Sequence, residues 1–135
     1  MIPALILLLA VAAFLQFFVS YCRSLIAAYG RVDLSEQVRE VTGITDHVVT
    51  AHDFRRLLQL VRMCPEPGDD GGEIRAVQAY YGLLRLAHAG VRRVVPALEN
   101  WFEREREQCS YFAAVALDRR IAHSRDLLAQ QMSDR

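Results

Sequence analysis

The chain has 135 residues, with 16 acidic residues balanced by 16 basic residues that are all arginine, so its formal net charge is zero. This length holds one small domain at most, and the balanced charge argues against nucleic acid as a partner. The three cysteines, Cys22, Cys64 and Cys109, are too few and too scattered for a disulfide framework.

The N-terminal segment is an uncharged apolar run from Ile2 to Cys22, in which Gln16 and Ser20 are the strongly polar residues. About twenty residues at about 1.5 Å each match the roughly 30 Å hydrocarbon core of a bilayer. A cleaved signal peptide would need basic residues before the apolar run, and a core helix of a soluble protein would be shorter. We therefore predict an uncleaved transmembrane anchor helix with a juxtamembrane extension over residues 1–31, followed by a helical domain over residues 32–135.

The charges that flank the predicted span indicate its orientation. No arginine precedes it, whereas Arg23, Arg31 and Arg39 follow it. Because positive charges favour the cytoplasmic side, we expect a single-pass protein of the cell membrane with its C-terminal domain in the cytoplasm.

The predicted span has two different faces. Phe14, Phe17, Phe18, Tyr21 and Leu25 share one stripe at helical spacing, and a second stripe is small or polar. The second stripe is predicted to contact a partner helix or a second copy, because such residues allow close approach and hydrogen bonding between membrane helices. Its members are Ala13, Gln16, Ser20 and Ser24. The alternative is that Ala and Ser are simply common in membrane helices.

After the span, Gly30 is the expected end of the first helix, and a short connecting helix is expected over residues 33–40. Thr50 and Asp53 resemble a capping box in front of an amphipathic helix that runs to Met63. The apolar stripe of that helix is Phe54, Leu57, Leu58 and Val61. The acidic loop 64–73, rich in Pro and Gly, then interrupts regular structure.

The strongest helical periodicity follows the loop, and Gly90 and Pro96 divide it into two helices or one bent helix. The residues of this seam are Ile74, Val77, Tyr81, Leu84, His88, Val91, Val95, Leu98 and Phe102. Residues 103–108 are polar on every face and are expected to stay outside the core, whereas residues 111–117 are apolar on almost every face and are expected to be buried. The end of the chain is expected to fray. The overall prediction is an all-α protein, a single N-terminal transmembrane helix followed by a small helical bundle.

No catalytic, cofactor-binding or metal-binding motif is present, since CxxC, HxxxH, HExxH and GxSxG patterns are all missing from the sequence. We therefore predict no catalytic residue, no cofactor, no metal site and no enzymatic activity. A site assembled from distant residues stays open at this point.

The charge of residues 74–98 is one-sided, because this segment contains arginines and no acid. The predicted basic docking face is Arg75, Gln78, Arg85 and Arg92. Such a face suits anionic lipid or an acidic partner, although pairing with the flanking acids inside the bundle is the alternative.

Two functions follow as hypotheses. The first is a membrane-anchored interaction or scaffold protein, which would be a small accessory subunit of a membrane-associated assembly. Its expected partners are the lipid bilayer and either another protein or a second copy of the chain. The second is a membrane-tethered sensor or ligand-binding domain, with a pocket lined by Tyr80, Tyr81, His88 or Trp101.

Overall fold

The computed structural model describes residues 1–30, 40, 50, 52–68 and 71–134. These residues form four α-helices and one 3-10 turn, with no strand among them, which confirms the predicted all-α fold. The helices are α1 (Ile2–Tyr29), α3 (Phe54–Met63), α4 (Gly71–Val91) and α5 (Glu99–Ser133), and the turn η1 (Pro96–Leu98) precedes α5. The short helix predicted over residues 33–40 falls outside the described residues, apart from Glu40.

Helix α1 is the candidate span. Of the described helices it is the one long and apolar enough to cross a membrane, and none of its most apolar 18-residue stretch is buried. A core helix of a soluble protein would bury most of that surface. The helix ends before Gly30, as predicted, where the Gly30 N–H donates to the Ile26 carbonyl at 2.9 Å.

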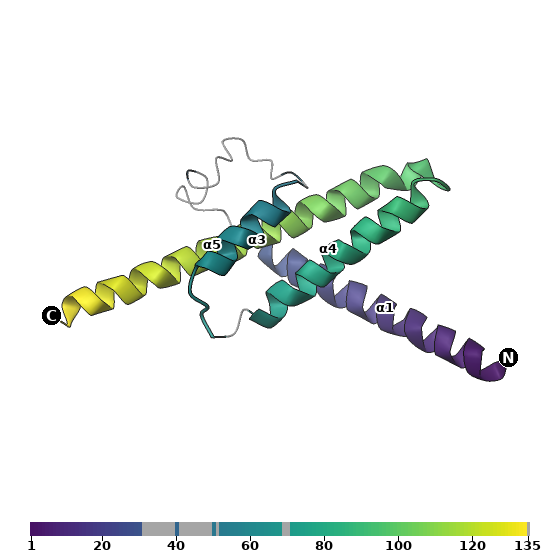
Figure 1. Ribbon diagram of the computed structural model, residues 1–135, viewed down its shortest axis with the longest axis horizontal. Coiled ribbons are helices and arrows are strands. Elements are labelled where there is room, and N and C mark those ends of the chain that lie inside the picture. Colours follow the sequence, from purple (N-terminus) through teal and green to yellow (C-terminus); the bar gives the residue numbers. More distant parts are fainter. Residues whose placement is uncertain (31–39, 41–49, 51, 69–70, 135) are drawn as a thin grey trace.

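Helix α5 is the centre of the bundle and contacts each of the other helices (Figure 1). Helix α4 precedes the turn at η1 and lies antiparallel to α5 (Figure 1). Helix α3 packs on α5, and α1 crosses the α4–α5 pair (Figure 1). The N-terminal end of α1 and the C-terminal end of α5 project from opposite sides of the molecule.

The core follows the predicted apolar stripes. All four stripe residues of α3 are buried, as are Val77 and Leu84 from the seam on α4. The block Phe112–Leu117 of α5 is buried throughout, as its all-round apolar character predicts. Full burial of a Val, Leu or Phe side chain stabilises the fold by about 1.5–3 kcal/mol.

The last two turns of α1 belong to this core. Cys22, Ile26 and Tyr29 recur at steps of four and three, share one face of the helix and are buried in the same cluster as α4 and α5. Residues 2–17, in contrast, are exposed along their whole length. The projecting part of α1 and the bundle are therefore joined by continuous helix rather than by a loop.

The prediction that residues 103–108 stay outside the core is wrong at Glu105, which is only 4% exposed. Glu105 lies on the same face as Phe102, Cys109 and Phe112, so the helical period turns it inward among three buried side chains. Helix α5 continues to Ser133, and residues 125–134 are all exposed.

Candidate functional site

The most distinctive cluster in the bundle is a buried carboxylate that joins three helices. The guanidinium Nε of Arg23, on α1, lies 3.4 Å from Oε1 of Glu105, on α5. The Tyr80 hydroxyl, on α4, donates a 2.8 Å hydrogen bond to Oε2 of the same carboxylate. Each carboxylate oxygen thus has its own partner, as a buried charge requires.

The surroundings of this cluster suppress its reactivity. Burial, together with the hydrogen bond to Glu105 and its negative charge, raises the pKa of Tyr80. Burial, and then the nearby Glu105 charge, raises the pKa of Cys109 to about 12. Both groups therefore stay protonated near neutral pH, and the protonated Cys109 thiol is a poor nucleophile. The cluster therefore has the chemistry of a structural contact between helices rather than of a catalytic site. We call these three residues, Arg23, Tyr80 and Glu105, the joint at Glu105.

A second polar contact fixes the end of α1. The Tyr29 hydroxyl donates to the Glu73 carboxylate in a short hydrogen bond, and it accepts a 2.7 Å hydrogen bond from Arg119. The Arg119 guanidinium also lies 4.3 Å from the centre of the Tyr29 ring, and the ring meets Phe112 edge-on. An aromatic residue shortly after an apolar span often lies at the membrane interface, but the Tyr29 side chain is buried in the bundle.

A third contact involves Arg120, which is 3% exposed. It donates to the carbonyl of Val61 at 2.8 Å and to that of Cys64 at 3.4 Å, at the end of α3, and it lies 3.7 Å from the Glu66 carboxylate. The last carbonyls of a helix lack the usual partners in a following turn, so this cation adds a donor at that end, beside the Cys64 N–H that also reaches the Val61 carbonyl. Glu66 and Glu73, from the predicted acidic loop, therefore both pair with side chains of the bundle.

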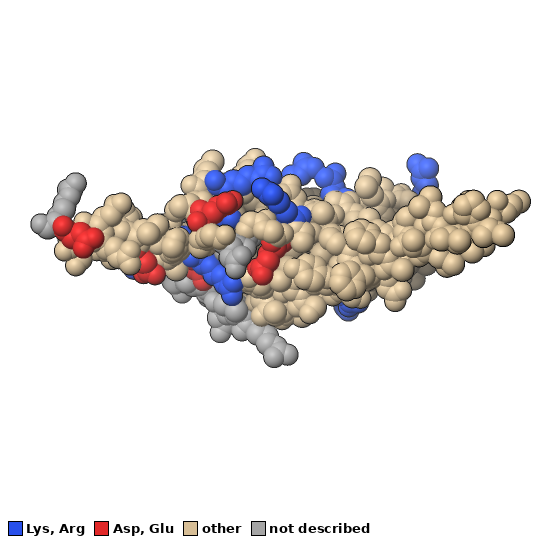
Figure 2. Space-filling model, turned by 90° about the horizontal axis from the view of Figure 1, so that it is seen from below, with Lys and Arg blue, Asp and Glu red and all other residues tan. Residues whose placement is uncertain are grey.

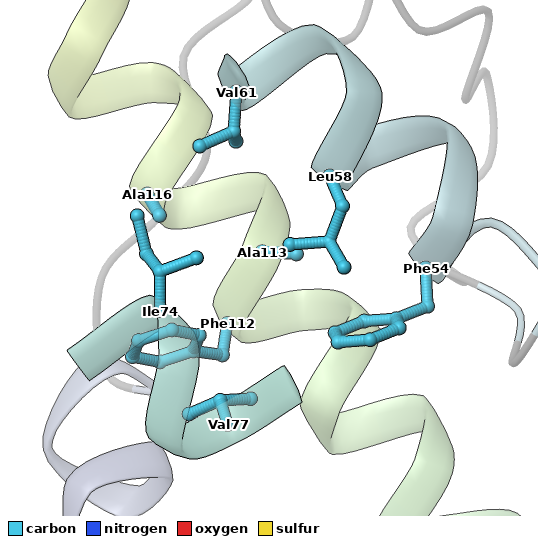
Figure 3. Close-up of a pocket in the computed structure, with 8 residues that line it drawn as sticks. All are labelled: Phe54, Leu58, Val61, Ile74, Val77, Phe112, Ala113 and Ala116. Atoms are coloured by element: carbon cyan, nitrogen blue, oxygen red, sulfur yellow. The ribbon is translucent and has the colours of Figure 1, made fainter. Parts of the chain in front are cut away.

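The bundle contains a shallow apolar pocket between α3, α4 and α5 (Figure 3). Only apolar side chains line it, and their packing leaves no room for a water molecule. The lining residues are Phe54, Leu58, Val61, Ile74, Val77, Phe112, Ala113 and Ala116. With no polar group to orient a ligand, it has the character of an imperfectly filled core.

The four side chains suggested for a ligand pocket do not line this space. Tyr80 binds Glu105, and Tyr81 stacks on Phe54 at 4.1 Å between ring centres. His88 and Trp101 both lie against Phe102. They are thus divided among separate contacts.

The predicted contact stripe of the span is exposed at all four positions, Ala13, Gln16, Ser20 and Ser24. The N-terminal end of α1 carries no charged side chain, while charges gather over the bundle (Figure 2). The side chains of the predicted basic docking face, Arg75, Gln78, Arg85 and Arg92, are exposed as well. Within the described residues none of its three arginines forms an ion pair, and Gln78 accepts a hydrogen bond from Arg62 at 3.3 Å.

No protein-family model, curated protein or solved structure matches the chain. Among the residues that the structure describes, no group of three His, Cys, Asp or Glu side chains is placed to hold a metal ion.

Proposed function

We propose that the chain is a single-pass membrane protein that acts by binding other proteins, as a small accessory subunit of a membrane-associated assembly. The observation that carries this proposal is the exposed position of Gln16 and Ser20 on α1. In hydrocarbon, polar side chains favour a partner helix with which they can form hydrogen bonds. The flanking Ala13 and Ser24 are small enough to allow that helix to approach closely.

The joint at Glu105 supports a role in which the span and the bundle act together. Because Arg23, Tyr80 and Glu105 connect α1, α4 and α5, a partner held by the span would find the bundle in a defined position. A flexible linker would not provide this. The basic docking face then offers a second contact, for anionic lipid or for an acidic surface of the same assembly.

The proposed location is the cell membrane, with the bundle in the cytoplasm. Arg23 supports this orientation, since it follows the apolar run and is more than half exposed. The buried positions of Cys22, Ile26 and Tyr29 support retention of α1, because removing it would open the core. A tag on the C-terminus, tested for protease access in intact cells and in inverted vesicles, distinguishes the two orientations.

The test uses the full chain, solubilised in mild detergent at native expression level. Light scattering after size exclusion gives the mass of the complex, and mass spectrometry identifies co-purifying chains. We expect an assembly heavier than one copy of 15.3 kDa, and we expect the double variant Gln16→Leu, Ser20→Leu to lose much of it.

The matched control is the double variant Phe14→Leu, Phe17→Leu, which changes the aromatic stripe of the same helix and should leave the assembly intact. A wild-type protein that is purely monomeric contradicts the proposal. So does equal loss of assembly in the two double variants, because that would reflect a general defect of the span.

The alternative function, a tethered sensor or ligand-binding domain, has less support. The apolar pocket has no polar lining group, and it leaves no room for a water molecule.

A further inference from the structure

The turn between α4 and α5 presents apolar side chains to solvent. We call residues 85–101 the hairpin tip; they comprise the end of α4, η1 and the first residues of α5. Val94 and Leu86 are 78% and 76% exposed. The exposed large apolar side chains of the tip are Leu86, Val94, Val95, Leu98 and Trp101. Exposed apolar side chains gathered in one short segment, with charged residues beside them, are a feature of binding surfaces.

The charge around the hairpin tip is mainly positive. Arg85, Arg92 and Arg93 are exposed, and among the described residues none of them forms an ion pair. The one acid of the tip, Glu99, lies 3.9 Å from His88. The combination of Trp, aliphatic side chains and Arg is typical of protein surfaces at the headgroup level of a bilayer.

The order of contacts places the hairpin tip on the same side of the bundle as the span. Arg23 contacts Glu105, whereas Tyr29, further along α1, contacts Phe112 and Arg119, further along α5. Toward lower residue numbers, both helices therefore run to the same side. Figure 1 shows this arrangement, with the tip and the N-terminal half of α1 on one side and the C-terminal end of α5 on the other.

The length of α1 brings this side of the bundle to the membrane surface. Residues 2–17 are free of the bundle and are about 24 Å long, which is less than the roughly 30 Å hydrocarbon core. Glu105 is the partner of Arg23. The six residues of α5 before it, back to the first residue Glu99, extend up to about 9 Å further toward the span side. That reach matches the depth of about 5–10 Å at which interfacial helices lie.

We propose that the hairpin tip inserts into the headgroup region of the bilayer that α1 crosses, with its arginines on anionic headgroups. The bundle would then be held at two points, which fixes its tilt and leaves the opposite end, around the C-terminus of α5, free for proteins. This inference rests on α1 being the membrane span, and it does not depend on which protein partner the span binds.

The chain provides its own probe, because Trp101 is its only tryptophan. The unmodified full-length protein is reconstituted into vesicles of phosphatidylcholine and phosphatidylglycerol, with bromine atoms on the acyl chains either near the headgroups or near the chain ends. We expect bromine near the headgroups to remove most of the Trp101 emission and deep bromine to remove less. Aqueous iodide should quench weakly.

Two sets of variants sharpen the test. Val94→Ser with Leu98→Ser should shift Trp101 emission to longer wavelength and weaken quenching by lipid; Arg92→Gln with Arg93→Gln should reduce the difference between anionic and neutral vesicles. The matched control, Leu128→Ser with Met132→Ser, alters exposed apolar side chains at the far end of α5 and should change neither signal.

Flotation of the vesicles separates the possible failures. A protein that does not float with the vesicles contradicts the membrane anchor itself. A protein that floats while Trp101 is quenched by iodide and not by brominated lipid overturns the inference alone. Shielding of Trp101 from both quenchers also overturns it, because it indicates a protein contact at the tip.

Discussion

Arg23 on the candidate span α1 pairs with Glu105 on α5, with 3.4 Å between guanidinium and carboxylate. Their environments differ, because the Arg23 side chain is 56% exposed and the Glu105 side chain only 5%. The attraction between the two charges therefore adds little to the stability of the fold, because solvent screens Arg23. The larger contribution of Glu105 is the hydrogen bond that it accepts from the buried Tyr80 hydroxyl.

We expect Glu105→Ala to lower the free energy of unfolding by about 1–3 kcal/mol, because it leaves the buried Tyr80 hydroxyl without an acceptor. Arg23→Gln should cost at most about 1 kcal/mol, since an exposed partner is largely screened by solvent. Thermal unfolding in detergent, followed by circular dichroism, measures both changes.

The control is Glu107→Ala, which removes an exposed glutamate two positions along the same helix and should stay within about 0.5 kcal/mol of wild type. Equal effects at positions 105 and 107 would mean that the buried carboxylate has no special role.

Arg120 supports the second prediction. Arg120→Met keeps an apolar stem but leaves the carbonyls of Val61 and Cys64 without this donor, which should cost about 1.5–3 kcal/mol. Arg120→Lys should recover part of the loss, because an ammonium group keeps the charge but lacks the fork of donors. Unfolding midpoints of the two variants test this order; a lysine variant as unstable as the methionine variant would contradict it.

Most of the buried apolar core could be predicted from the sequence. The stripe of α3, Val77 and Leu84 of the seam on α4, and the block 112–117 of α5 are buried where helical periodicity placed them, because burial of apolar side chains follows from their spacing. The same seam was wrong at Val95 and Leu98, which are exposed. The ends of α1 and α3, at Gly30 and Met63, were also predictable, since Gly and a Pro-rich loop stop helices.

The joint at Glu105 could not be predicted in the same way. Several glutamates follow Leu98, and which one turns inward depends on Arg23 and Tyr80, which come from other helices. Only Phe102 and Cys109, three residues before and four after Glu105, hint at its inward face. Tyr29 was likewise ambiguous, because an aromatic residue after a span suits a membrane interface as well as a core.

The third prediction concerns alkaline pH. The folded-state pKa values of Cys109 and Tyr80 are raised above their ordinary values of 9.0 and 10.0. Their contribution to stability is therefore complete below about pH 9 and is lost as pH rises toward and beyond the pKa of Cys109, about 12, because the unfolded chain releases these protons first.

Unfolding midpoints should accordingly fall between pH 9 and pH 12. The fall should be smaller in Cys109→Ala, whereas Cys64→Ala, which changes a half-buried thiol, should retain the wild-type slope. Maleimide labelling of the folded protein at pH 8 provides an independent check, with Cys64 reacting before Cys109. Rapid labelling of Cys109 would contradict its burial.

The last prediction separates the core of α5 from its free end. Residues 127–134 are exposed, whereas Arg120, seven residues before them, is almost fully buried. Ending the chain after Asp126 should therefore change the free energy of unfolding by no more than about 0.5 kcal/mol, since it removes little buried surface. Ending it after Asp118 removes Arg119 and Arg120 and should prevent stable folding, because the Tyr29 hydroxyl and the end of α3 lose the cations that bind them. If the shorter truncation also lowers the midpoint of the isolated protein, the end of α5 contributes to folding; if it leaves the midpoint unchanged but reduces the co-purifying chains, the free end is part of the docking surface for the partner.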